Sequence, residues 1–316
     1  MNKNLIKIIV FLLVICIAIT AIYICIKNNY KQTKEIETVN KSETKKEAAK
    51  ANINGDNPKE TENKTNSLEG LKEEIQKEIE NYDGEWAVYV EDLSNGDYIE
   101  INNKKMVSAS LIKLFIMGKT YEEIEKGNMQ EDAVEESLKS MITISDNEAS
   151  NVLVAAIGGG KYTDMYSETF KKGLKEVNSY VSSLDFKNTE QQRDMKNSRP
   201  TPIPEQNYTS VSDCGKFLSK LYHKELVSET FDEKMLNLLK QQTRTSKIPR
   251  GLPEGTVCAN KTGELSNVEN DVAIVFSQGA DYVICIMSNN VTNTAKAREN
   301  ITNISKNVYE FFNESL

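Results

Sequence analysis

The sequence predicts an α+β domain in two parts: an antiparallel five-stranded sheet built from both chain ends and flanked by helices, and an all-helical subdomain between the two groups of strands. Three observations predict it. Two extended runs open the globular region, a mostly helical stretch from Ser108 to Lys247 follows, and three more extended runs come near the C-terminus. A helical pattern flanks the strands at each end, over residues 68–79 and 294–312.

The first elements lie between residues 68 and 101. Leucine and isoleucine recur at helical spacing from Leu68 to Ile79, and Tyr82-Asp83-Gly84 is a turn signal that ends this helix. The runs Trp86–Val90 and Tyr98–Ile101 are rich in β-branched and aromatic residues, and the segment between them contains the Asp, Asn and Gly of a tight turn. These two runs therefore predict a hairpin.

The last elements complete the sheet. Extended runs over Val257–Asn260, Val272–Phe276 and Tyr282–Met287 predict three strands, and the pattern from about Thr294 to Phe312 predicts a terminal helix. We expect residues 68–316 to form a single domain, because about 250 residues are enough for one well-buried core.

The chain in front of this domain divides into two segments. Ile8 to Ile26 is an uninterrupted uncharged run, long enough as a helix to cross a bilayer, so residues 1–27 are expected to be a single-pass transmembrane anchor. A cleaved signal peptide is the alternative, but such peptides have a shorter apolar core and a small-x-small cleavage site. Residues 28–67 contain almost no large apolar side chain, which predicts a disordered linker rather than a helical stalk.

Composition limits the partners of the chain. Its 316 residues carry a formal net charge of −8 at pH 7, which disfavours nucleic acid because phosphate binding needs clustered Lys and Arg. Cys214, Cys258 and Cys285 stand singly without metal-ligand spacing, so no disulfide framework is predicted. We expect neither a metal nor an organic cofactor.

Three short strings carry chemistry: Ser110-Leu-Ile-Lys113, Ser145-Asp-Asn147 and Lys261-Thr-Gly263. Together they offer a nucleophile, proton-handling groups and a clamp for an anion. The single histidine, His223, lies in a polar helical stretch, so a Ser-His-Asp relay could be assembled in only one way. A serine activated by lysine has no such restriction, and the strings therefore favour serine acyl transfer.

The first string gains its meaning from its context. Ser110 precedes an apolar helical run and is predicted in the first turn, where its hydroxyl meets the positive end of the helix. The three-residue spacing places the Lys113 amine on the same helix face, and burial would push this amine toward the neutral form that accepts a proton. The alternative is that Ser110 caps the helix and Lys113 extends to solvent.

The other two strings suit a site around Ser110. Ser145-Asp-Asn147 lies at a predicted helix–helix junction, where its hydroxyl and amide could pass a proton and hold a substrate amide; ordinary N-capping is the alternative. Lys261-Thr-Gly263 ends a predicted strand, and its ammonium and hydroxyl suit a carboxylate, while the glycine permits close approach of a substrate backbone. A surface turn with a solvated lysine is the alternative here.

With these three strings in this order, residues 68–316 resemble the class A β-lactamases and penicillin-binding serine acyltransferases, which implies a β-lactamase/transpeptidase-like fold. The flanking sequences Ser145–Asn151 and Asn260–Glu264 add to the resemblance. It implies that Ser110 is the acylated nucleophile, Lys113 its activator and Ser145 the proton shuttle to the leaving nitrogen. By the same resemblance, Asn147 contacts a substrate amide, Lys261, Thr262 and Gly263 bind the substrate carboxylate end, and the backbone N–H groups of Ser110 and Glu264 form an oxyanion hole.

The pattern departs from this family at deacylation. Class A enzymes carry a Glu-x-x-x-Asn string after the second signature, and no such string occurs over Leu184–Asp194, where Glu190 and Asp194 are the candidate carboxylates. Glu264-Leu265 also replaces the small residues that normally follow Lys-Thr-Gly, which leaves the choice of substrate open.

Three hypotheses follow. The first is a membrane-tethered class A-type β-lactamase that acylates Ser110 with a β-lactam amide and hydrolyses the acyl-enzyme. The second, favoured by the missing glutamate, is a D-alanyl-D-alanine peptidase or penicillin-binding protein that acts on a D-alanyl peptide and deacylates slowly. The third is a non-catalytic cell-wall-binding module. Lysines flank the apolar run almost equally on both sides, so this chemistry, rather than charge, places the domain on the extracellular face of the cell membrane.

Overall fold

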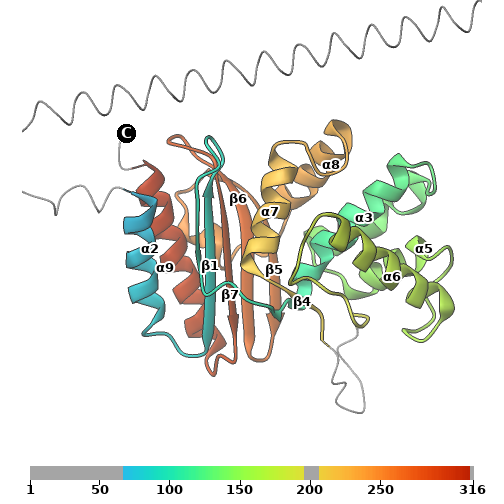
Figure 1. The fold of residues 1–316 in the computed structure, drawn as a ribbon, viewed down its shortest axis with the longest axis horizontal. Coiled ribbons are helices and arrows are strands. Elements are labelled where there is room, and N and C mark those ends of the chain that lie inside the picture. The colour runs from blue at the N-terminus through green and yellow to red at the C-terminus, as the bar shows by residue number, and fades with distance from the viewer. Residues whose placement is uncertain (1–66, 196–205, 314–316) are drawn as a thin grey trace, which may run out of the picture. The chain divides into compact units, whose positions relative to one another are not determined.

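A five-stranded antiparallel sheet forms the centre of the domain in the computed structural model, which describes residues 67–195 and 206–313 (Figure 1). The strand order is β2-β1-β7-β6-β5. The N-terminal hairpin pairs with the last strand, so that Val88 lies opposite Ile286, and both chain ends build one sheet. The predicted α+β architecture is confirmed. The strands are β1 Glu85–Asp92, β2 Tyr98–Ile101, β5 Val257–Leu265, β6 Val268–Phe276 and β7 Tyr282–Asn289.

One face of the sheet is covered by the two terminal helices, α2 (Leu68–Ile79) and α9 (Thr294–Asn313) (Figure 1). The predicted apolar spacing holds in α2, which buries Leu71, Ile75 and Ile79, while Ser67 caps the helix by accepting a hydrogen bond from the Gly70 N–H. These side chains pack with strand residues in one apolar cluster. The helices thus bury the sheet face that points away from the helical subdomain.

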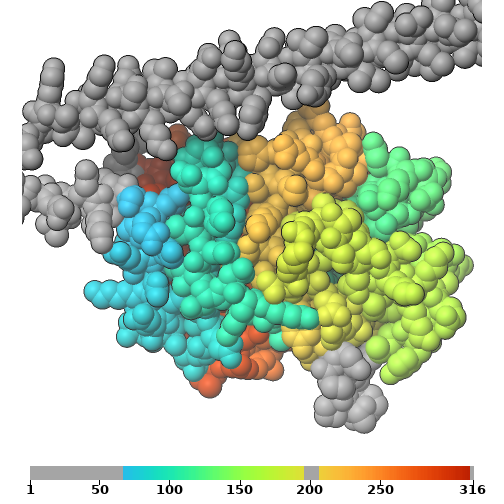
Figure 2. Space-filling view, viewed as in Figure 1, coloured from blue at the N-terminus to red at the C-terminus, as the bar shows by residue number. Residues whose placement is uncertain are grey.

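The opposite face of the sheet packs against α7 (Val211–Tyr222), and the helical subdomain lies beyond it (Figure 1). In the space-filling view α7 lies between the blue-to-teal N-terminal elements and the green-to-yellow subdomain (Figure 2). The remaining helices are α3 Lys113–Glu125, α4 Glu135–Thr143, α5 Asn147–Ile157, α6 Glu168–Ser183 and α8 Glu229–Lys240, with short 3₁₀ turns η1 Ala109–Ile112, η2 Glu131–Ala133 and η3 Ile248–Gly251.

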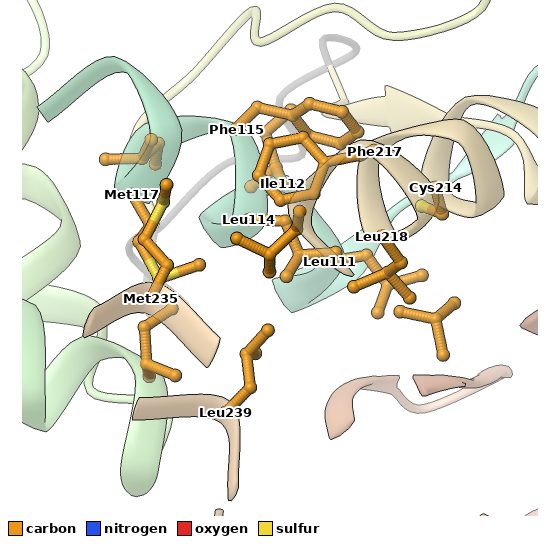
Figure 3. Close-up of a cluster of buried hydrophobic side chains, with 14 of the residues drawn as sticks. Leu111, Ile112, Leu114, Phe115, Met117, Cys214, Phe217, Leu218, Met235 and Leu239 are labelled. Carbon is orange, nitrogen blue, oxygen red and sulfur yellow. The ribbon is translucent and has the colours of Figure 1, made fainter. Parts of the chain in front are cut away.

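The core of this part is centred on α3. The rings of Phe115 and Phe217 meet edge to face with centroids 5.2 Å apart, and Met117, Leu218 and Met235 complete the cluster (Figure 3). Phe115 is fully buried, and truncating such a side chain to alanine costs about 3–5 kcal/mol. Because α3 is buried along most of its length, the turn that precedes it is held firmly in place.

Glycines allow α5 and α6 to cross closely. A Cβ on Gly158 would lie 1.8 Å from the Thr169 carbonyl oxygen, and one on Gly173 would lie 1.7 Å from the Val154 carbonyl oxygen. Any larger residue would therefore push the two helices apart. Gly158 is also the C-terminal cap of α5.

The structure corrects three details of the predicted elements. The helical block is interrupted by a small second sheet in which β3 (Met106–Val107) pairs with β4 (Tyr208–Thr209), and two-residue strands are too short to produce a periodic pattern. β5 continues through Leu265, so Lys261-Thr-Gly263 lies inside a strand instead of at its end. Ser110 lies in the 3₁₀ turn η1, one turn before α3 begins.

Several further predictions concern residues outside the three motif strings. His223 lies at the exposed C-terminal end of α7, where its Nδ1 is 2.9 Å from the Ser219 carbonyl oxygen. Cys214, Cys258 and Cys285 are free thiols. Over residues 67–195 and 206–313 no helix has the length and apolar character needed to cross a membrane. The anchor expected at residues 1–27 and most of the expected linker lie outside the described residues.

Candidate active site

Ser110 lies on the turn η1, which is clamped against the sheet. The Asn270 side chain, fully buried on β6, donates to the carbonyl oxygens of Val107 (3.0 Å) and Ser108 (3.3 Å). Ala109, directly before Ser110, has a φ of 46°, a left-handed conformation that costs a residue with a Cβ about 1–3 kcal/mol. The packing therefore imposes the backbone conformation that presents the serine. Within the described part of the chain, the partly exposed Ser110 hydroxyl makes no hydrogen bond.

Gly263 on β5 is required for this arrangement. A Cβ at Gly263 would lie 2.7 Å from the Ser108 carbonyl oxygen and 3.3 Å from the Leu111 backbone nitrogen. We predicted that this glycine lets a substrate backbone approach closely. In the structure, the segment that approaches is the serine turn itself, so Gly263 brings the edge strand and the candidate nucleophile together.

Lys113 is fully buried, yet its amine contacts neutral oxygens. Nζ donates to the Ser145 carbonyl (2.7 Å), the Asn147 Oδ1 (2.8 Å) and the Ser145 Oγ (3.2 Å). Burial lowers the pKa of Lys113 to about 7; the Asp146 charge opposes this shift and the Arg244 charge adds to it. A substantial fraction of the amine is therefore neutral near pH 7. The sequence predicted this lowering of the pKa. The Lys113 amine, however, donates its hydrogen bonds to Ser145 and Asn147 and not to the Ser110 hydroxyl.

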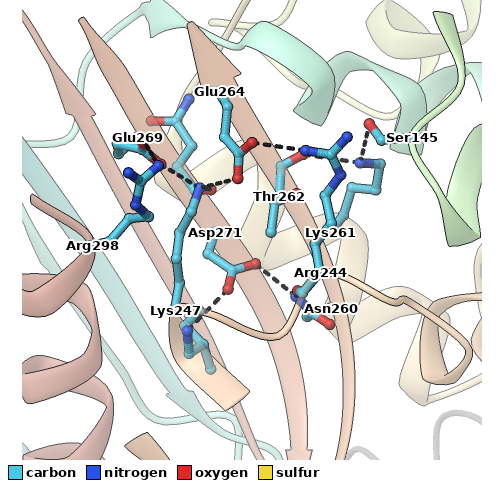
Figure 4. Close-up of polar contacts among 12 residues, drawn as sticks. Ser145, Arg244, Lys247, Asn260, Lys261, Thr262, Glu264, Glu269, Asp271 and Arg298 are labelled. Carbon is cyan, nitrogen blue, oxygen red and sulfur yellow. Dashed lines mark hydrogen bonds and ion pairs between the residues drawn. The ribbon is translucent and has the colours of Figure 1, made fainter. Parts of the chain in front are cut away.

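Ser145 lies between two lysines. Its Oγ accepts from Lys113 Nζ at 3.2 Å. It also accepts from Lys261 Nζ at 2.9 Å (Figure 4). The residue has a φ of 63°, a second left-handed conformation at this site. Asp146 caps α5 by accepting from the Ala149 N–H at 2.6 Å, so the capping that we considered as an alternative is performed by Asp146 and leaves the Ser145 hydroxyl to the lysines.

Lys261 is also fully buried and, among the described residues, its amine donates to two neutral oxygens, Ser145 Oγ and the Thr262 carbonyl, each at 2.9 Å. Burial holds its pKa well below the usual range for lysine, and the positive charges of Lys113 and Arg244 lower it further. The solvated-lysine alternative is therefore wrong. Asn147 begins α5 and gives its carbonyl oxygen to Lys113, which leaves the amide nitrogen end for a ligand.

A second group of charges, partly missed by the sequence analysis, adjoins this site on β5 and β6. Glu264 accepts from Arg244 Nη1 at 2.8 Å and lies 3.1 Å from Lys247 Nζ, which in turn lies 2.7 Å from Glu269 (Figure 4). Arg298 pairs with the other Glu269 oxygen at 2.8 Å. Arg244 and Lys247 lie in a polar segment before η3, and no sequence motif identifies them as site residues. Their role becomes visible only from their contacts with Glu264 on β5.

Asp271 is buried beneath these charges. It accepts from the Asn260 amide and from the Ile248 N–H, each at 3.0 Å. Burial raises its pKa to about 6, although the Lys247 charge opposes the shift. Asp271 lies opposite Thr262 in the β5–β6 ladder, so it supports the strand that carries Lys261.

The two carboxylates considered for deacylation are engaged elsewhere. Glu190 pairs with Lys105 at 2.7 Å, which lowers the pKa of Glu190, and its backbone bridges to Tyr208. Asp194 accepts a hydrogen bond from the Tyr162 hydroxyl at 2.6 Å. Over residues 67–195 and 206–313, no group of three or more His, Cys, Asp or Glu side chains could hold a metal ion.

The chain is similar to known proteins in sequence and in fold. The sequence matches a family described as "Beta-lactamase enzyme family" over residues 70–136 and 131–312. Similar structures include a beta-lactamase from Sphaerobacter thermophilus (21% identity, TM-score 0.66, covering 78% of this chain and 98% of that one) and the TLA-1 extended spectrum beta-lactamase (19%, 0.68, 77% and 98%). A PBP-A variant, described as an acyl-enzyme complex with penicillin G, is 22% identical with a TM-score of 0.67 over 79% of this chain and 98% of that one.

The structural likenesses establish the fold, and the family match extends over most of the chain. Hydrogen bonds join Lys113, Ser145 and Lys261, which come from three separate parts of the chain, and Ser110 lies on the turn η1 that packs against Gly263 of the edge strand β5. The chain therefore belongs to the beta-lactamase enzyme family and is a serine hydrolase of the β-lactamase type.

Proposed function

We propose that the chain opens the amide of a β-lactam by acylating Ser110 and then hydrolyses the acyl-enzyme, as a class A-type β-lactamase. One observation carries this proposal: the buried Lys113 amine has a pKa of about 7 and hydrogen-bonds Ser145, which also accepts from Lys261. Acyl transfer from a serine requires a general base that accepts the hydroxyl proton, and a neutral amine held beside a hydroxyl can act as that base.

In the proposed acylation, the Ser110 Oγ forms a bond to the amide carbonyl carbon while Lys113 accepts the hydroxyl proton. The negative charge on the carbonyl oxygen faces the backbone N–H groups of Ser110 and Glu264. The C–N bond then breaks, and the leaving nitrogen takes a proton from Ser145, which Lys113 replenishes across the 3.2 Å hydrogen bond. Asn147 contacts the substrate amide, and Lys261 and Thr262 bind the carboxylate of the substrate.

Slow deacylation is the second candidate. In that case the chain acts as a D-alanyl-D-alanine peptidase or a penicillin-binding protein on a D-alanyl peptide. The engagement of Glu190 by Lys105 and of Asp194 by Tyr162 supports it, because a carboxylate that activates water must be free to accept the proton. The PBP-A variant described as a penicillin G acyl-enzyme has the same fold.

The test uses the full-length protein with a fluorescent penicillin and a chromogenic cephalosporin. Many turnovers would support the β-lactamase, and a long-lived adduct on Ser110 would support the second candidate. Ser110→Ala should lose both signals, whereas Ser266→Ala, on the exposed turn between β5 and β6, should keep them. If the unaltered protein shows neither turnover of the cephalosporin nor a penicillin adduct, the remaining hypothesis is a non-catalytic cell-wall-binding module.

The location of the chain is part of the proposal. The uncharged run Ile8–Ile26 would anchor it in the cell membrane with residues 68–316 on the extracellular face, where β-lactams and cell-wall peptides occur. Protease added to intact spheroplasts should then remove the domain from the cells. Protection of the domain until the membrane is lysed would contradict this orientation.

A further inference from the structure

Glu264 is paired with Arg244, which lies beside the predicted substrate-binding string Lys261-Thr-Gly263. Its Oε2 accepts from Arg244 Nη1 at 2.8 Å, and its Oε1 lies 3.1 Å from Lys247 Nζ (Figure 4). Both partners of the Arg244 pair remain accessible: the Arg244 side chain is 46% exposed and that of Glu264 is 29% exposed. A ligand can therefore reach this pair without unfolding any element.

This pair lies at the carboxylate-binding end of the site. Glu264 follows Thr262 by two residues on β5, so the two side chains leave the same face of the strand. The Arg244 charge is close enough to lower the pKa values of both Lys113 and Lys261. Arg244 and Glu264 also line an open cavity of about 690 Å³, together with Thr243, Arg250 and Arg298. There is room for a substrate group directly beside the two side chains.

We propose that Glu264 is a specificity-determining residue: by neutralising Arg244, it reduces the preference of the site for substrates that carry a carboxylate at this end over substrates that are neutral there. The inference rests on the proposed acylation of Ser110. A planar guanidinium binds a carboxylate through paired hydrogen bonds, and here the carboxylate of the chain itself already fills that position.

The physical reason is a competition between two anions. A substrate carboxylate that approaches Lys261 and Thr262 must either displace Glu264 from Arg244 or lie close to a second negative charge, and juxtaposed like charges are unfavourable. Lys261 offsets this repulsion between the two carboxylates only weakly, because its amine already donates to Ser145 and to the Thr262 carbonyl. Lys247 keeps a partner in Glu269 if Glu264 moves, so displacement is feasible but opposed.

The test measures how fast the full-length protein is acylated at Ser110 by benzylpenicillin and by its methyl ester, which lacks the carboxylate charge, using intact-protein mass spectrometry. In Glu264→Gln the ratio of acid to ester rate constants should rise about tenfold, the size expected for removing one partly solvated charge near the ligand. Glu264→Thr, which also shortens the side chain, should raise the ratio in the same direction.

Two further variants act as controls. Glu254→Gln removes the same charge from an exposed turn before β5 and should leave the ratio unchanged. In the double variant Arg244→Gln with Glu264→Gln, the gain should disappear, because the guanidinium that the substitution releases is gone. A thermal unfolding curve for each variant establishes that it is folded.

An unchanged or lower ratio in both Glu264 variants, with Ser110 still acylated, would overturn this inference and leave the proposed function intact. A lower ratio in particular would mean that Glu264 holds Arg244 in position for the substrate carboxylate. Failure of both compounds to acylate Ser110 in any variant would overturn the proposed function and this inference with it.

Discussion

Two centres of buried lysine lie next to each other on the edge of the sheet, and they differ in what surrounds the amine. Lys113 and Lys261 are fully buried and donate to hydroxyl, amide and backbone oxygens. Lys247 is equally buried, but it lies 2.7 Å from Glu269 and 3.1 Å from Glu264. Among the residues that the structure describes, equally buried lysines are thus left without a carboxylate partner in one centre and given two carboxylates in the other.

The difference separates chemistry from structural support. An amine without a counter-ion loses its proton readily, because burial penalises the charged form, and it becomes a base. An amine between two carboxylates links the segment before η3 to β5 and β6 and holds the strand that carries Lys261. We therefore expect substitutions at Lys113 to change the acylation rate and substitutions at Lys247 to change the free energy of unfolding.

The largest effect is expected from Lys113→Met. This substitution removes the proposed proton acceptor, and the acylation rate of Ser110 should fall by about three orders of magnitude, within the range of a general base. Burst kinetics with a fluorescent penicillin measure it. Acylation within tenfold of the unaltered rate would show that Lys113 is not the base and would break the comparison.

Lys247→Met should act on stability instead. It leaves Glu269 and Glu264 without their shared buried cation, and the free energy of unfolding should fall by about 3–5 kcal/mol. Urea denaturation of the full-length protein, followed by circular dichroism, measures the loss. Lys72→Met, which removes an exposed pair with Glu69, is the control and should leave the midpoint unchanged. Equal midpoints for both variants would contradict the structural role.

The pH dependence sharpens the comparison. Because Lys113 has a pKa of about 7 and acts in its neutral form, acylation should accelerate as the pH rises from about 6 to about 8. The unfolded lysine holds its proton up to about pH 10.4, so between pH 7 and 10 the unfolded chain binds more protons and this group makes stability increase with pH. A rate that is flat across pH 6–8 would contradict the assignment.

The smallest effect is expected from Asp146→Asn. Asp146 raises the pKa of Lys113, and asparagine caps a helix as well as aspartate, so the substitution changes the charge while α5 keeps its cap. The midpoint of the pH–rate profile should move down by about half a pH unit. Glu148→Gln removes an exposed charge from the same first turn and should leave the midpoint in place. An upward shift in Asp146→Asn would be inconsistent with the sign of this interaction.

Much of the fold could be predicted from sequence because local patterns specify its elements. The spacing of Leu71, Ile75 and Ile79 predicted α2, and the β-branched runs predicted all five strands of the main sheet. The β3–β4 pair was missed, since two residues give no period, and the end of β5 was placed too early because Lys261-Thr-Gly263 has a polar composition. In the strand this polar string is held by tertiary contacts with η1 and β6.

The sequence by itself determined which residues could do chemistry: a serine and a lysine three residues apart, a second serine with an asparagine, and a strand-borne lysine. Only the tertiary structure decided that Ser145 lies between Lys113 and Lys261, which are 32 and 116 residues away from it in the chain. It also decided that Arg244 and Lys247 take up the Glu264 carboxylate. The reason is physical: burial and charge pairing depend on which segments pack together, and no local pattern encodes the distance between them.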